Sequence, residues 1–211
     1  MYLPPISYFS SFPFFGGPLP EPTVKPEVLT TQSSNDTQDD DIYALLYALE
    51  LATLLPPMDE TAVDDFAVNL FRALRYNRAG WAVKTITDIP LLICGEQRHA
   101  KTDVCVVNHS GIQHLDRQER VLHGITMSGT SPTFYKIRVT SALAHAVERQ
   151  YPAQQTVVYA HLPQVSRPQY RSQEGMRPLD NRYIILCCYT AFEWSTTSGI
   201  TSRAAVSSIG K

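Results

Sequence analysis

The fold of this chain is decided by residues 89–108, which read IPLLICGEQRHAKTDVCVVN. Two apolar runs on either side of a polar turn predict a pair of strands joined as a hairpin. Asp103 stands near the start of the second strand, on the face that it shares with Cys105 and Val107. Because an acid in an apolar strand is costly without a partner or a cation, Asp103 is either a solvent-facing edge residue or half of a metal site.

Helical and strand patterns surround this hairpin in both directions. One amphipathic helix is expected between the acidic run at 39–41 and Pro56, and a second from about 59 to 76. The remaining expected elements are strands at 81–86, 89–94, 102–107, 124–128, 134–139 and 157–162, a short helix after Thr140, and a helix over 180–192 of which 183–188 alone also fits a strand. This order predicts a mixed α+β (α/β) fold.

The two ends of the chain differ in composition from its middle. Residues 1–40 are rich in Pro, Ser and Thr and are expected to be disordered, since they offer too little apolar area to offset chain entropy. Residues 41–194 then form a single α/β domain, and 195–211 a flexible tail. We expect no membrane span, no signal peptide, and an intracellular location in the cytoplasm or nucleus.

The four cysteines are predicted to be reduced thiols. Cys187 and Cys188 are adjacent, and Cys94 and Cys105 lie within the two apolar runs, where a thiol packs like a small apolar side chain. A cross-strand bridge between Cys94 and Cys105 is the alternative. Neither free thiols nor a disulfide at these positions predicts a cofactor.

The net charge of −2 combines an acidic first half with a basic stretch after residue 100. Arginines near Tyr170 form a candidate nucleic-acid surface, to which the arginine of the hairpin turn is added, because Arg beside an aromatic ring suits phosphate and base contacts. These residues are Arg98, Arg167, Arg171, Arg177 and Arg182. A solvated loop is the alternative interpretation.

Common enzyme signatures are absent from the sequence. It contains no P-loop, no G-x-G-x-x-G, no G-x-S-x-G and no H-E-x-x-H. His109, His114 and His123 cluster, but with no cysteine near them we expect exposed loop histidines rather than a zinc site.

Three long segments resemble one family. They are 89–108 quoted above, GITMSGTSPTFYKIRVT at 124–140 and GMRPLDNRYIILCCYTAF at 175–192. Together they are similar to an uncharacterised family abundant in mushroom-forming fungi, over roughly residues 63–193. The resemblance implies a PD-(D/E)XK, restriction-endonuclease-like layout, with Asp103 as the first metal-binding acid.

In that layout a second strand ends in E-x-K, and its acid joins the first in holding Mg²⁺, while the lysine orients the nucleophile. Here the residues after Val107 read NHSGIQHLDRQERVLHGITM, which lacks that strand. The resemblance therefore implies a truncated restriction-endonuclease-like sheet flanked by helices. Lys101 lies on the same strand face as Asp103, but a lysine cannot replace a second carboxylate.

Three hypotheses about function follow. The first is a non-catalytic or degenerate relative of Mg²⁺-dependent nucleases, in which Asp103 is a vestigial metal ligand and Lys101 its neighbour. The second is an active nuclease that uses Asp103 with Asp116 or Glu119 and needs Mg²⁺. The third is a non-enzymatic accessory or protein-binding protein. The sequence favours an absence of catalysis, with nucleic acid as a candidate partner.

Overall fold

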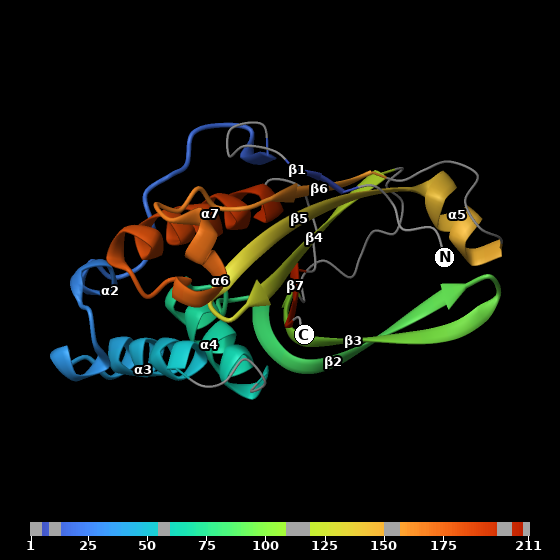
Figure 1. The fold of residues 1–211 in the computed structure, drawn as a ribbon. Coiled ribbons are helices and arrows are strands. Elements are labelled where there is room, and N and C mark those ends of the chain that lie inside the picture. Colours follow the sequence, from blue (N-terminus) through green and yellow to red (C-terminus); the bar gives the residue numbers. More distant parts are fainter. Residues whose placement is uncertain are drawn as a thin grey trace.

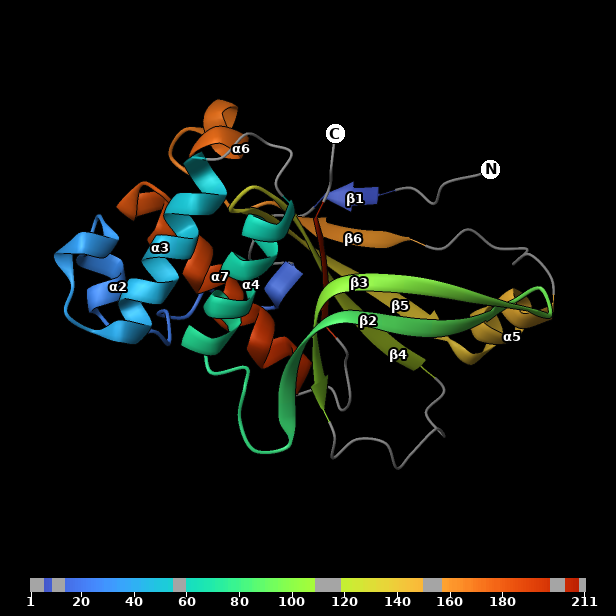
Figure 2. The ribbon, with the colours of Figure 1, turned by 90° about the horizontal axis from the view of Figure 1, so that it is seen from below.

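The computed structural model describes residues 6–8, 14–54, 60–108, 119–149, 157–197 and 204–208. These residues form a mixed α+β fold, which confirms the predicted class. All of the helices except the one at 141–149 gather at one end of the strands, and a long hairpin extends away from them toward that remaining helix (Figures 1 and 2).

Two antiparallel units make up most of the sheet. One is the β2–β3 hairpin and the other is the β4–β5–β6 meander; the backbone of β7 pairs with β3 and β4 between the two units, and β1 pairs with β6. The strand order is β1-β6-β5-β4-β7-β3-β2. The bounds are β1 Ile6–Tyr8, β2 Trp81–Ile93, β3 Glu96–Asn108, β4 Glu119–Ser128, β5 Ser131–Thr140, β6 Val158–His161 and β7 Ala204–Ser208.

The helices follow the predicted positions with two additions. Their bounds are α2 Glu27–Thr30, α3 Asp40–Leu54, α4 Glu60–Ala73, α5 Ser141–Arg149, α6 Arg171–Glu174 and α7 Leu179–Thr197, with 3-10 turns η1 Ser34–Asp36 and η3 Pro168–Tyr170. The additions are α2, which falls in the expected disordered segment, and α6, which falls in an expected loop. None of the helices that the structure describes has the length and apolar character that crossing a bilayer requires.

The core lies where α3, α4 and α7 meet the sheet. The predicted apolar stripes are buried, with Leu46 on α3 and Phe66 and Leu70 on α4 almost fully shielded from solvent. Val104 of β3 and Phe134 of β5 meet them from the sheet. Burial of these side chains is the main favourable term in folding.

The N-terminal segment is ordered over residues 14–40, contrary to the expectation of disorder. Phe14 and Val28 are buried, and the guanidinium of Arg182 donates hydrogen bonds to the carbonyl oxygens of Val28 (3.0 Å) and Thr31 (2.6 Å). The segment gains its contacts from α7 and from β5 and β6, far along the chain, so its own composition does not reveal them. The rest of residues 1–13, apart from β1, lies outside the described residues.

The C-terminal part also differs from the prediction. Helix α7 continues to Thr197, and residues 204–208 form β7 where a flexible tail was expected. The strands predicted at 81–86 and 89–94 are one strand, β2, and the predicted hairpin turn shortens to Cys94 and Gly95. Cys94 is exposed with a left-handed φ of 53° at this turn, so it is not the apolar strand residue that we expected.

The hairpin tip is held by helix α5. The amides of Cys94 and Gly95 donate hydrogen bonds to the carbonyl oxygens of Val147 (2.7 Å) and Glu148 (2.6 Å). Carbonyl groups in the last turn of a helix have no partner within it, so the tip satisfies two of them. This contact fixes the far end of the hairpin.

Candidate functional site

Asp103 lies half-buried at a break in the β2–β3 ladder. Thr85 pairs with Val104 and Thr87 pairs with Thr102, and the strand register skips the intervening Ile86 and Asp103. Ile86 has a left-handed φ of 48°, which is a strained conformation for a β-branched residue. The candidate metal-binding acid therefore lies opposite a distorted point of the hairpin.

Asp64 of α4 lies near enough to Asp103 to be affected by its negative charge. Burial raises the pKa of Asp64 to about 6, and the negative charges of Asp103, Glu60 and Asp65 add to this increase. Divalent cations are commonly held by one or two carboxylates together with water or phosphate oxygens. Sequence reasoning missed Asp64, since nothing in its surroundings predicts that the charge of a residue some forty positions later acts on it.

Glu119, the second acid considered in the sequence, lies far from Asp103. Across β7, Val104 of β3 is level with Ile125 of β4, because both pair with Val206. Glu119 begins β4, six residues before Ile125, so the two acids are separated by roughly 20 Å or more along the sheet and by an intervening strand. This register does not bring the backbone of Glu119 next to that of Asp103, and Asp116 lies outside the described residues.

Lys101 is exposed on β3, two residues before Asp103. Its strand partner in β2 is Asp88, whose carboxylate is 3.0 Å from Nδ1 of His99. Within the described parts of the chain, no set of three or more His, Cys, Asp or Glu side chains is arranged to hold a metal ion. Asp64 and Asp103 together fit an ion only with water or a ligand completing its shell.

The arginines proposed as one nucleic-acid surface do not come together. Arg98 lies in β3 near the hairpin tip and pairs with Glu96 at 2.5 Å, whereas Arg167, Arg171 and Arg177 lie around α6 at the opposite end of the molecule (Figure 1).

The α6 arginines mostly have partners within the protein. Arg167 is 3.1 Å from the carboxylate of Glu174, and Arg171 donates a hydrogen bond to the carbonyl oxygen of Pro163 (2.6 Å). Arg182, which the sequence placed beside them in an exposed loop, is 1 % exposed inside α7. Most of these arginines are therefore already engaged in contacts within the protein.

His123, expected in an exposed loop, is buried in β4. Its ring makes an edge contact with Phe192, with 5.1 Å between the ring centroids. Burial, with the nearby positive charge of Lys136, lowers the pKa of His123 to about 4. His109 and His114 lie outside the described residues.

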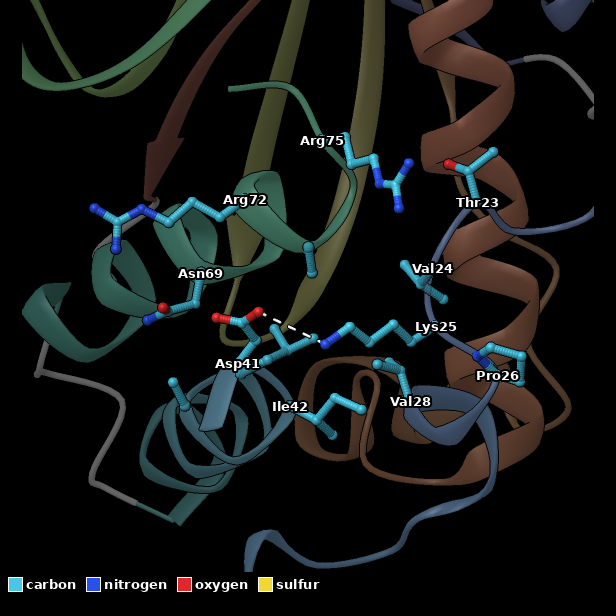
Figure 3. Close-up of a pocket in the computed structure, with 13 residues that line it drawn as sticks. Thr23, Val24, Lys25, Pro26, Val28, Asp41, Ile42, Asn69, Arg72 and Arg75 are labelled. Atoms are coloured by element: carbon cyan, nitrogen blue, oxygen red, sulfur yellow. Dashed lines mark ion pairs between the residues drawn. The ribbon is translucent and has the colours of Figure 1, made fainter. Parts of the chain in front are cut away.

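A cavity of about 620 Å³ opens among α3, α4 and the segment at 23–28 (Figure 3). Lys25, Arg72 and Arg75 bring positive charge to its lining, and Asp41 is its single acidic residue. The sequence analysis did not identify this site. Its only signal is the pair of arginines three residues apart at the end of a predicted helix, and a pair of that kind commonly serves just to offset the helix dipole.

Comparison of the chain with protein-family models, with curated protein sequences and with solved structures gives no match.

Proposed function

We propose that this chain is a non-catalytic relative of the Mg²⁺-dependent nucleases and acts by binding rather than by hydrolysis. The observation that supports this proposal is the register of the sheet, which separates Asp103 from Glu119 by an intervening strand. Phosphodiester cleavage by this class of enzyme needs two acids on one ion and a lysine directed at the nucleophile. Asp103 has Lys101 on its strand, while Asp88, an acid of the adjoining strand β2, lies 3.0 Å from Nδ1 of His99.

A second candidate function rests on Asp64. The negative charge of Asp103 helps to raise the pKa of the Asp64 carboxyl. The two acids together are a candidate Mg²⁺ site in which helix α4 supplies the second carboxylate. Under this alternative, Lys101 stabilises charge on the phosphate, and the chain is a weak metal-dependent phosphodiesterase.

Nuclease assays separate the two. The full chain is incubated with supercoiled plasmid and with single-stranded DNA, in Mg²⁺ or Mn²⁺, alongside Asp103→Ala, Asp64→Asn and the control Asp88→Asn, whose acid is on the exposed side of β2 beside His99. The proposal predicts equal, background-level cleavage for all four proteins.

Metal-dependent cleavage by the wild type that is lost in Asp103→Ala and Asp64→Asn, but kept in Asp88→Asn, would overturn the proposal and establish the second candidate. Cleavage that survives in every variant would place an active site elsewhere in the chain and also contradict the proposal.

A further inference from the structure

The cavity beside α4 has an excess of positive charge that the protein itself does not neutralise. Lys25 is matched by two acids, with its ammonium 2.5 Å from Asp39 and 3.6 Å from Asp41. In contrast, no hydrogen bond or ion pair joins the guanidinium of Arg72 or Arg75 to another residue within the described parts of the chain. Figure 3 shows the two arginines on different sides of Asp41, with Arg75 extending toward Thr23 and Arg72 lying near Asn69.

Arg75 occupies a backbone position that ordinarily belongs to glycine. Helix α4 ends in a Schellman motif, in which the amide of Tyr76 donates to the carbonyl of Phe71 and the amide of Arg75 donates to the carbonyl of Arg72, both at 2.9 Å. The rings of Phe71 and Tyr76 pack at 5.1 Å, as the apolar contact of this motif requires.

The residue between them, Arg75, therefore has a left-handed φ of 59°. Glycine would adopt this conformation without strain, whereas a side chain makes it unfavourable. A strained residue whose side chain lines a cavity is a reason to look for a ligand there.

Part of the cavity lining is apolar. Val24 and Val28 from the N-terminal segment and Ile42 and Leu45 from α3 contribute hydrocarbon to the lining. The volume falls within the range of pockets that enclose small organic ligands, which typically combine an apolar lining with a few polar anchors. A bare inorganic anion would leave this apolar surface without a partner.

We propose that the cavity binds a small amphiphilic organic anion. Its carboxylate or phosphate group is held by the guanidinium fork of Arg75, with Arg72 adding positive charge at the rim, and its hydrocarbon part packs against the half-buried Val24 and Ala44. Arginine suits this role because its planar donors match both acid groups. The site is separate from Asp103 and does not depend on the outcome of the nuclease assays.

Calorimetric titration of the full chain with octanoate, octyl phosphate, octanol and inorganic phosphate tests the proposal. We expect saturable one-to-one binding of at least one of the two octyl anions, and binding at least tenfold weaker for octanol and for inorganic phosphate. The tighter of the two anions identifies the preferred acid group, and their affinity should fall as salt is added.

Arg75→Gly is the decisive variant, because glycine relieves the strained φ while it removes the guanidinium. It should melt at the temperature of the wild type or a few degrees above it, yet lose at least tenfold in affinity for the octyl anion. Arg75→Lys should lose less. Arg149→Ala, which removes an exposed arginine of α5 outside the cavity, should bind as the wild type does.

The proposal is overturned if neither octyl anion binds saturably, if octanol binds as tightly as the anions, or if Arg75→Gly binds with wild-type affinity. Because Arg75→Gly is expected to keep its fold, a loss of affinity in this variant is not attributable to unfolding.

Discussion

Arg182 shows how a single buried side chain organises the N-terminal part of the molecule. Its guanidinium donates hydrogen bonds to the carbonyl oxygens of Met176, Val28 and Thr31, and the negative charge of Glu50 lies near enough to stabilise its positive charge. Burial lowers the pKa of Arg182 to about 10, which leaves it charged at neutral pH. The residue thus ties α7 to segment 14–40 instead of facing solvent.

Replacing Arg182 by leucine should lower the free energy of unfolding by about 3 kcal/mol or more, because several buried carbonyl groups lose their donor together. Urea denaturation followed by circular dichroism measures the change. The exposed Arg177→Ala is the control and should stay within about 0.5 kcal/mol of the wild type. A leucine variant as stable as Arg177→Ala would contradict this structural role.

At the scale of the element, the β2–β3 hairpin is bent at one residue. Ile86 is 77 % exposed, has a left-handed φ and interrupts the ladder opposite Asp103. Because Ile86 is exposed, its side chain gains little free energy from burial. The backbone strain at this position is therefore not offset by packing, and its visible consequence is the bend in the hairpin.

Ile86→Gly should therefore raise the free energy of unfolding by about 1 kcal/mol, since glycine accepts the left-handed conformation. The matched control is Lys84→Gly, two residues earlier on the same strand, where glycine should lower stability by about 0.5–1 kcal/mol. Urea midpoints of the two variants provide the comparison. If both variants are destabilised alike, the left-handed conformation of Ile86 is not a source of strain.

At the scale of the whole molecule, stability depends on pH through buried titratable groups. His123 has a pKa of about 4 in the folded protein against 6.5 for an ordinary histidine, so the unfolded chain binds the proton more readily. Its contribution to stability is complete above pH 6.5 and is lost as the pH falls toward 4. The raised pKa of Asp64 acts in the opposite sense, favouring the folded state at low pH, but its partial exposure makes the effect smaller.

His123→Gln should remove the first of these effects. Between pH 7 and pH 4 the free energy of unfolding should fall by about 3 kcal/mol more in the wild type than in the variant. Urea titrations at a series of pH values measure both curves. Parallel curves would show that the histidine titrates normally in the folded protein.

Across the whole chain, patterns within one element predicted structure well. The apolar spacing of Ile42, Leu45 and Leu49 located α3, and the alternation around Cys105 located β3, because both depend on neighbours a few residues apart. The ordered segment 14–40 was missed because its partners, such as Arg182, lie far along the chain. β7 was missed because short strands acquire their stability from pairing and not from composition.

The candidate sites also divide into those that one segment reveals and those that depend on contacts between elements. Asp103 was found because an acid in an apolar strand is conspicuous within the sequence itself. Asp64 and the cavity residue Arg75 gain their significance from α4 meeting other elements, and the left-handed φ of Arg75 leaves no trace in its residue type. The sequence did not reveal which elements lie close together in the fold or which residues have an unusual backbone conformation.

The place of β7 in the sheet has a consequence for how this protein is made. Its neighbours β3 and β4 leave the ribosome about a hundred residues earlier, and until 204–208 arrive each presents an open row of amides and carbonyls. Such long-range closure slows folding and invites pairing with other nascent chains. Chaperone capacity during translation would then govern how much protein a cell accumulates.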